Sequence, residues 1–197
     1  DIEVYKEFWS EYGLVLKEGP AEDFENKESI AELLLFASSN KEIHEVDQTL
    51  DDYISRMPSD QKGIYYCVAD TFEGALNSPH LESLKSKNTE VLLLTDRIDE
   101  WLMSTLFEFK GKSFINVAKT SNEAEEKPKT TKNQNELLTK VADHLGDKVS
   151  EVLASSRLKD SACCLVLQNN EPGIQLRKIL EAAGQKMGDV VPIFELN

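Results

Sequence analysis

Apolar residues recur every three or four positions through the first third of the chain, a spacing that predicts amphipathic helices. A first helix is expected over residues 2–13, ending at Gly13, with apolar positions at Val4, Tyr5, Phe8, Trp9 and Tyr12. A second is expected over residues 20–39, with Pro20 in its first turn and apolar positions at Phe24, Ile30, Leu33, Leu34 and Phe36. A third covers residues 49–57, where Thr49 and Asp52 form a candidate capping box.

The pattern then changes to two predominantly apolar segments, residues 63–70 and 90–96, which predict buried strands. Helical patterns follow each run, over residues 72–88 with a break near Ser78 and Pro79, and over residues 97–106. Buried strands joined by helices favour parallel pairing with a right-handed crossover. Residues 107–118 predict a hairpin that turns at Lys110 and Gly111.

Residues 121–134 contain a single alanine as their only apolar residue, so they cannot bury enough surface to order themselves and are interpreted as a linker. Beyond it we expect a helix ending at Gly146, paired strands over residues 148–158 and 162–168, a helix over residues 173–188 and a last strand. The predicted fold class is α+β. Residues 1–120 form a helical segment and a small α/β/α sandwich, and residues 135–197 form a small domain with a three-stranded sheet.

The charge of the chain narrows the choice of partner. A formal net charge of −14 over 197 residues repels nucleic acid and anionic membranes, so protein partners are expected. There is no apolar run of about 18 residues and no signal peptide, which favours a cytoplasmic protein. Cys67, Cys163 and Cys164 are interpreted as buried, reduced thiols, and without a Cys-x-x-Cys motif no zinc site is expected. The first residues already have a helical pattern, so the chain is expected to be a piece of a longer protein.

Motifs for catalysis are largely missing. Residues 111–113 match the last residues of a phosphate-binding loop motif, but Leu106 occupies the position where that motif requires a glycine. These residues are also expected in a hairpin, whereas a phosphate-binding loop joins a strand to a helix. We therefore expect no catalytic residue, metal site or cofactor site in this chain. The alternative hypothesis is an α/β enzyme domain whose carboxylates lie at the end of a strand, where open sheets place their sites. Those carboxylates would be Asp96, Asp99 and Glu100.

Six blocks of sequence carry a resemblance to a known family. The order and separation of these blocks are similar to those of the heat-shock protein 90 family. Their residues are most similar to those of its bacterial members, the HtpG chaperones. The resemblance covers residues 1 to about 120, and extends more loosely over residues 135–197 through "RL", "AAGQK" and "IFELN". The six blocks are "FWSEYGLVLKEGPAEDFENKESIAELLLFASS", "LDDYISRMP", "KGIYYCVAD", "NSPHLESLKSK", "EVLLLTDRIDEWLM" and "EFKGKSF".

This resemblance implies an ATP-driven, homodimeric chaperone of the stress response, with three domains. The chain would hold the late middle domain and the start of the C-terminal domain. The ATP and magnesium site would precede Asp1, and the dimerisation helices would follow Asn197. The chain itself would then be a monomer without ATPase activity. Its partners would be non-native client proteins and possible co-chaperones.

The resemblance also implies which residues contact clients. Glu100 and Trp101 match a Glu-Trp pair on the client-facing surface of the family, and Leu176, Ile179 and Leu180 match apolar positions of an exposed amphipathic helix. Pro172 stands where that helix has a methionine, which puts this contact in doubt. From the residues alone, a tryptophan after a strand-to-helix turn is more often part of the core. Both interpretations of Trp101 stay open here, and client contact predicts a partly exposed indole on the same side as the three C-terminal residues.

Overall fold

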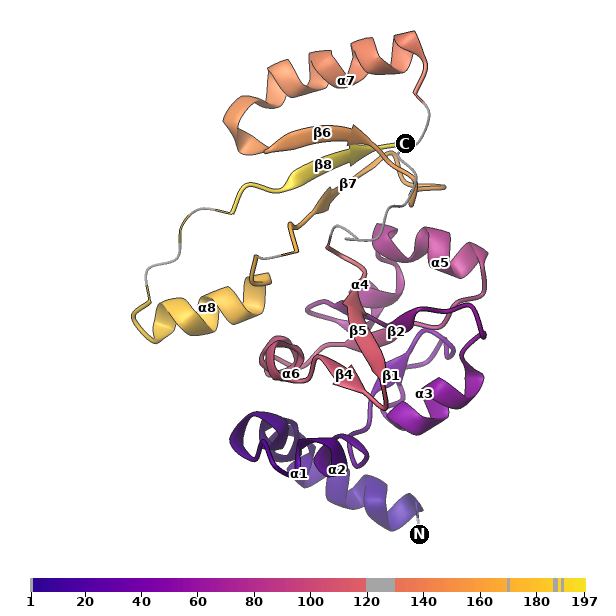
Figure 1. Ribbon diagram of the computed structural model, residues 1–197, viewed down its shortest axis with the longest axis vertical. Coiled ribbons are helices and arrows are strands. Elements are labelled where there is room, and N and C mark those ends of the chain that lie inside the picture. The colour runs from indigo at the N-terminus through magenta and orange to yellow at the C-terminus, as the bar shows by residue number, and fades with distance from the viewer. Residues whose placement is uncertain (1, 120–129, 170, 186–187, 189) are drawn as a thin grey trace. The chain divides into compact units, whose positions relative to one another are not determined.

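The computed structural model describes residues 2–119, 130–169, 171–185, 188 and 190–197 (Figure 1). The chain divides into two compact units, which are described separately. Unit 1 comprises residues 1–77 and 88–116, and unit 2 comprises residues 78–87 and 117–197. Residues 121–129 of the predicted linker lie outside the described residues. The mixed α+β class expected from the sequence is confirmed by helices together with two sheets.

Helix α1 (Ile2–Glu22) is longer than predicted. The expected end at Gly13 is wrong: the indole of Trp9 lies over this residue, and a Cβ placed there would be 2.7 Å from the ring. Glycine inside a helix costs about 1 kcal/mol, which the burial of the surrounding apolar face offsets. Pro20 lies inside α1 rather than at the start of a second helix, so that prediction is also wrong.

The predicted helix over residues 20–39 is largely absent. Only α2 (Lys27–Ala31) forms, and the chain then enters the short strand β1 (Ala37–Ser38). Phe24 is 77% exposed and Leu33 is 49% exposed, whereas Leu34 and Phe36 are buried. The error arises because residues 33–36 are four apolar residues in a row, and such a run fits a helix and a buried extended segment equally well.

Unit 1 contains a five-stranded sheet in the order β1-β3-β2-β5-β4. The expected parallel pairing is confirmed between β2 (Gly63–Val68) and β3 (Leu92–Leu94), and β2 also pairs in parallel with β5 (Lys112–Asn116). The predicted hairpin joins β4 (Glu108–Phe109) to β5. Its turn residues have positive φ, 47° at Lys110 and 74° at Gly111, as a two-residue hairpin turn of this kind requires.

Short sequence motifs determine where the remaining helices of this region begin and end. The capping box of α3 (Leu50–Arg56) is confirmed, since Thr49 accepts a hydrogen bond from the N–H of Asp52 and the Asp52 side chain bonds back. The predicted break in residues 72–88 separates α4 (Phe72–Leu76) in unit 1 from the 3-10 helix η1 (Pro79–Leu81) and α5 (Glu82–Ser86) in unit 2. Helix α6 (Asp99–Thr105) follows β3.

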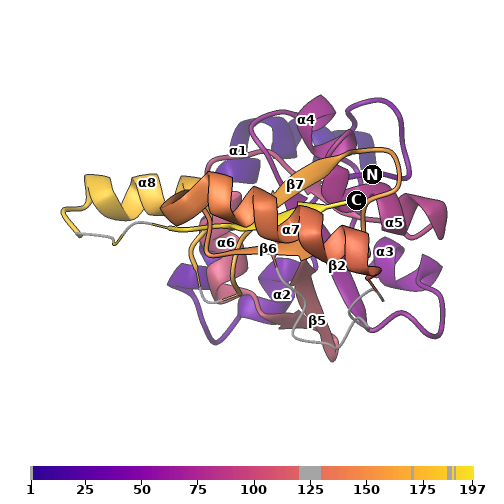
Figure 2. The same cartoon turned by 90° about the horizontal axis from the view of Figure 1, so that it is seen from above.

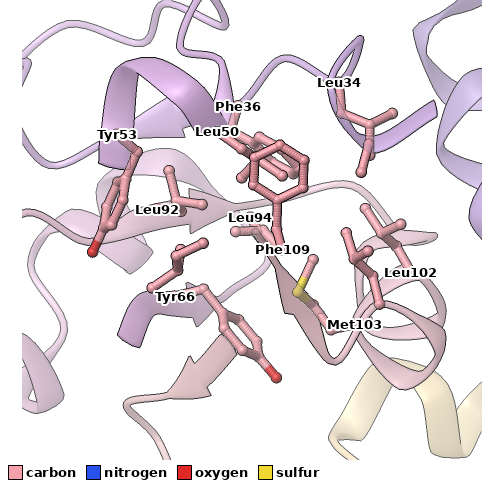
Figure 3. Packing of buried hydrophobic residues seen from close by; sticks show 13 residues of the cluster. Leu34, Phe36, Leu50, Tyr53, Tyr66, Leu92, Leu94, Leu102, Met103 and Phe109 are labelled. Atoms are coloured by element: carbon pink, nitrogen blue, oxygen red, sulfur yellow. The ribbon is translucent and has the colours of Figure 1, made fainter. Parts of the chain in front are cut away.

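The core of unit 1 lies between its sheet and its helices (Figure 3). Leu102 and Met103 from α6 point toward Phe109 of the hairpin. Leu94 from β3 lies beside Phe109, and Leu92 lies on the other side of the cluster, near Tyr53 and Tyr66. Trp9 and Leu16 of α1 pack against the edge of this cluster. The fully enclosed apolar residues of the cluster include Leu34, Phe36, Leu50, Tyr53, Ile64, Leu92, Leu94, Leu102, Leu106 and Phe109.

Unit 2 has a three-stranded sheet in the order β6-β8-β7. Strand β8 (Ile193–Leu196) lies between β6 (Glu151–Ala154), to which it is parallel, and β7 (Cys163–Val166), to which it is antiparallel. The prediction that residues 148–158 pair directly with residues 162–168 is therefore wrong. The strand from the end of the chain intervenes, a pairing that no local pattern reveals.

Two further helices belong to unit 2, one before and one after its first two strands in the sequence. Helix α7 (Lys132–Leu145) runs alongside β6 (Figures 1 and 2) and continues into the 3-10 helix η2 (Gly146–Lys148). Its capping box joins Thr131 to Gln134, so the helix begins inside the stretch predicted as linker. Helix α8 (Ile174–Ala182) ends sooner than the predicted residue 188. None of the helices in the described part of the chain is long and apolar enough to cross a membrane.

The cysteines follow the alternation of the strands. Cys67 and Cys164 are buried, as predicted, and all three cysteines are free thiols. The prediction is wrong for Cys163, which is exposed. Adjacent residues of a strand point to opposite faces, and Cys164 points into the small core of unit 2 with Leu158, Val166 and Ile193.

Candidate functional site

Trp101 lies on the outer side of α6. Its exposed fraction is 37%, whereas Leu102 and Met103, the next two residues, are buried in the core of unit 1. The neighbour one turn further on, Ser104, is also exposed, and its hydroxyl donates to the carbonyl of Trp101. A partly exposed indole agrees with the exposure expected for a contact residue and disagrees with a fully enclosed core tryptophan.

A buried ion pair holds the start of this helix. The Nζ of Lys17 on α1 donates to Oδ1 of Asp99 at 2.6 Å and to Oδ2 of Asp96 at 2.7 Å. Asp99 is fully buried and also accepts from the backbone N–H of Asp96 at 2.8 Å. Burial raises the pKa of Asp99, while Lys17 acts in the opposite direction and favours the charged carboxylate. The pair fixes α6 against α1, so the direction in which Trp101 projects is set by two helices.

Glu100, which precedes Trp101 in α6, is half-buried. Its charge reaches the phenol of Tyr66, whose pKa is raised to about 12, mainly by burial and secondarily by Glu100. An exposed indole favours apolar and basic groups, and a nearby carboxylate favours basic ones.

Two carboxylates of the alternative enzyme hypothesis, Asp96 and Asp99, are engaged by the buried Lys17. Asp99 has no exposed surface, and its carboxylate is engaged by Lys17 and by the backbone of Asp96. Among the described residues, no group of three His, Cys, Asp or Glu side chains could hold a metal ion. A cleft of about 120 Å³ in unit 1 lies elsewhere, between Tyr53, Met57 and Glu90. It is smaller than the roughly 300–1,000 Å³ of typical ligand pockets.

The second set of predicted residues lies on α8 in unit 2. Leu176, Ile179 and Leu180 share one face of this helix by their spacing, and all three are half-buried. They are not among the residues of the unit 2 core cluster. Figures 1 and 2 show α8 beyond one end of the strands of its unit. On its polar side, Arg177 pairs with Glu181 at 3.0 Å and its guanidinium donates to the carbonyl of Gly188.

The structure brings Glu100 and Trp101 together on α6, and Leu176, Ile179 and Leu180 together on α8. These two groups belong to separate units, so their expected placement on one side of the molecule stays a prediction. The assignment of all five as client contacts also stays a prediction.

Sequence reasoning missed Lys17. It lies on the same side of α1 as Gly13 and Pro20, which are also buried, and a lysine at such a position signals a buried acidic partner. That signal was present in the sequence, but it depended on knowing that α1 continues past Gly13.

Comparison with known proteins gives consistent matches over the whole chain. The sequence profile of the Hsp90 protein family matches residues 1–191. Three curated relatives bear the name "Chaperone protein HtpG": the chain is 48% identical over 206 residues to that of Shewanella pealeana, 49% over 210 to that of Shewanella loihica, and 46% over 208 to that of Shewanella halifaxensis. Each alignment covers 100% of this chain and 32% of the relative, so the chain spans about a third of their length.

Proposed function

Because this chain belongs to the Hsp90 protein family, we propose that it is the client-binding segment of an ATP-dependent molecular chaperone that assists protein folding. Its partners are unfolded or partly folded proteins, which expose apolar segments that a folded protein buries. Removing such segments from water is the driving force for association. The acidic surface of the chain limits its own aggregation and favours clients with basic residues.

The observation that carries this proposal is the exposure of Trp101 on a helix that is otherwise fixed in place. An aromatic side chain that stays 37% exposed on a rigid support loses little conformational freedom when it binds. The Lys17–Asp99 pair and the buried Leu102 provide that support from the inner side of α6. In this account Trp101 supplies apolar contact and Glu100 attracts basic groups of the client.

Helix α8 supplies the second contact. Leu176, Ile179 and Leu180 form an apolar face that an extended client segment can cover. A single tryptophan and a short helix face are each weak sites. Two weak sites within one polypeptide raise the overall affinity, because binding at the first increases the effective concentration at the second.

The remaining parts of the proposal come from family membership. We assign residues 1–120 to the middle domain of the chaperone and residues 135–197 to its C-terminal domain. The stretch predicted as linker, residues 121–134, lies between them, and α7 begins within its last residues. ATP and magnesium bind elsewhere in the parent protein, and this chain hydrolyses nothing. The parent is a cytoplasmic homodimer with possible co-chaperones, and the isolated chain is a monomer.

The test replaces Trp101 by alanine and measures two quantities on the same protein. Affinity for a reduced, alkylated protein that stays unfolded in buffer should fall about tenfold or more, since a large side chain that becomes buried contributes roughly 1.5–3 kcal/mol. The free energy of unfolding should change by much less than the roughly 3–5 kcal/mol lost when a core aromatic is truncated. Phe24→Ala is the matched control, because Phe24 is an exposed aromatic of the same unit at 77% exposure. It should leave affinity unchanged.

A different result would reject the proposal. If Trp101→Ala binds the unfolded protein as tightly as the unmodified chain, the indole is not a client contact. If the variant loses several kcal/mol of stability, Trp101 is a packing residue. If Phe24→Ala weakens binding as much as Trp101→Ala, the chain holds clients through any exposed aromatic and α6 is not a site.

A further inference from the structure

The stretch predicted as linker begins and ends in the same compact unit. Strand β5 ends at Asn116, the last residue of unit 1, and residues 117–119 already belong to unit 2. On the other side of the stretch, Thr131 caps α7, which also belongs to unit 2. The chain passes between the units after residues 77, 87 and 116, and none of these positions lies within residues 121–134.

Residues 117–119, which we call the edge segment, pair with the end of β7. Lys119 forms a parallel β-bridge with Leu167, and the N–H of Leu167 donates to the carbonyl of Ala118 at 3.1 Å. Leu167 directly follows β7, which is an outer strand in the order β6-β8-β7. The bridge therefore adds backbone pairing at an edge of the sheet, where backbone groups otherwise lack partners.

Arg157 holds the edge segment from the side of the sheet. Its guanidinium donates to the carbonyl of Val117 at 2.7 Å and reaches the carbonyl of Lys119 at 3.5 Å. Its Nε lies 3.1 Å from Oε2 of Glu195 on β8, and both side chains are largely buried. A buried guanidinium needs several acceptors, because water cannot solvate it. The central strand supplies one of these acceptors, and the backbone of the edge segment supplies the others.

Lys119 makes a connection in the opposite direction. Its Nζ donates to the carbonyl of Glu171 at 2.6 Å and to that of Asn169 at 3.2 Å, in the loop between β7 and α8. Hydrogen bonds from a charged donor are stronger than those between neutral groups. The edge segment is thus held by an arginine that follows the linker stretch in the sequence, and it holds a loop that follows the same stretch.

Residues 78–87 provide a second connection of the same kind. The carboxylate of Glu82 on α5 accepts from the N–H groups of Lys159 and Asp160 and from the hydroxyl of Ser161. Glu82 precedes the linker stretch, and the turn that it holds follows it. Two separate segments from the first part of the chain are therefore built into the fold of unit 2.

We infer that the stretch predicted as linker connects two parts of one folded unit and is not the tether between the units. The edge segment and Glu82 keep residues 130–197 attached to the rest of the chain through non-covalent contacts. A cut within the stretch therefore leaves the molecule assembled. Client contacts on α6 and α8 then act together even in the cut chain, a consequence that rests on the proposed function.

The test cuts the chain within this stretch. A protease recognition sequence replaces residues 122–128, and the full chain is purified before cleavage. On gel filtration at micromolar concentration, the two fragments should elute together at the position of the uncut chain. The amide of Leu167 should keep its slow hydrogen exchange after cleavage, because its acceptor on Ala118 stays in place.

Variants identify what holds the fragments together. In the cut chain, Lys119→Met should raise the dissociation constant of the two fragments about tenfold or more, because it removes hydrogen bonds from a charged donor. The matched control is Lys85→Met, which removes the same charge from an exposed position of α5 in unit 2. It should leave the dissociation constant unchanged, and the Leu167 amide should exchange faster only in the Lys119 variant.

Two results would overturn the inference. Fragments that separate on gel filtration would show that the stretch is the tether. Equal effects of Lys119→Met and Lys85→Met on the dissociation constant would show that the edge segment does not hold the fragments together. Neither measurement involves a client, so the inference can fail while the proposed function holds, and the reverse is also true.

Discussion

Lys17 is the residue that connects α1 to the proposed client site. It is 3% exposed and its Nζ lies between the carboxylates of Asp96 and Asp99, of which Asp99 is fully buried. A charge in such a place is stable only with its partner, because neither can be solvated by water. The pair therefore determines where α6 begins, and through α6 the position of Trp101.

Replacing Lys17 should lower the free energy of unfolding substantially. Lys17→Met leaves the Asp99 carboxylate buried without its cationic partner, and loss of one member of a buried ion pair typically costs roughly 3–5 kcal/mol of stability. The matched control is Lys41→Met, since Lys41 also bridges two carboxylates, Glu45 and Asp47, but at the surface. That change should cost less than about 1 kcal/mol. Urea unfolding of both variants measures the difference, and equal costs would show that the Lys17 pair adds nothing beyond a surface ion pair.

Glu82 makes the stability of unit 2 dependent on pH. Its carboxylate accepts from the Ser161 hydroxyl and from the N–H groups of Lys159 and Asp160, and these bonds lower its pKa to about 2. The folded pKa lies below the ordinary value of 4.5, so the stabilisation is present above about pH 4.5 and is lost as the pH falls toward 2. After allowance for solvent screening it amounts to about 1–2 kcal/mol.

Glu82→Gln tests this dependence. The free energy of unfolding, measured by urea denaturation from pH 7 down to pH 3, should fall more steeply for the unmodified chain than for the variant. At pH 7 the variant should be less stable by that same amount, and the two should converge in acid. Parallel pH curves would show that the Glu82 carboxylate does not stabilise the turn that contains Ser161.

At the scale of elements, α8 is expected to act as a binding helix. The double variant Leu176→Ser/Ile179→Ser should lower client affinity severalfold, because it removes apolar surface that the client would cover. Unfolding of unit 2 should change little, since its core cluster consists of other residues. Lys178→Ser, on the exposed side of the same helix, is the control and should not alter affinity. Unchanged affinity in the double variant would restrict the client site to α6.

Which elements could be predicted depends on the range of the interactions that define them. The capping box at Thr49 and the hairpin turn at Lys110 and Gly111 are set by neighbouring residues, and both were predictable. The insertion of β8 between β6 and β7 joins segments far apart along the chain, and no local pattern specifies it. Gly13 was misleading because propensity is a weak preference that the packing of Trp9 overrides.

The candidate site was predictable to a similar extent. The client-contact interpretation predicted a partly exposed indole at Trp101, and the structure agrees. The neighbouring Asp99, in contrast, is fully buried and depends on Lys17, a residue 82 positions away in the sequence. A buried charge can be placed only when its partner is known, and that partner comes from a different element.

At the scale of the whole molecule, composition and order of elements predicted the α+β class correctly. The two compact units divide the chain differently from the sequence blocks, because residues 78–87 join the C-terminal unit. Glu82 on α5 explains that assignment, since its carboxylate holds the turn at residues 159–161. A composition-based boundary cannot detect a helix that belongs with residues far beyond it.

The most direct test of client binding uses the two tryptophans, Trp9 and Trp101. Trp9 packs against the core of unit 1, whereas Trp101 is exposed on α6, so each indole N–H reports on one environment. The chain is labelled with ¹⁵N-tryptophan and titrated with an unlabelled, reduced and alkylated protein. Client contact at α6 predicts that the Trp101 indole signal shifts or broadens while the Trp9 signal stays unchanged. Equal changes in both signals, or none in the Trp101 signal at saturating client, would contradict the account.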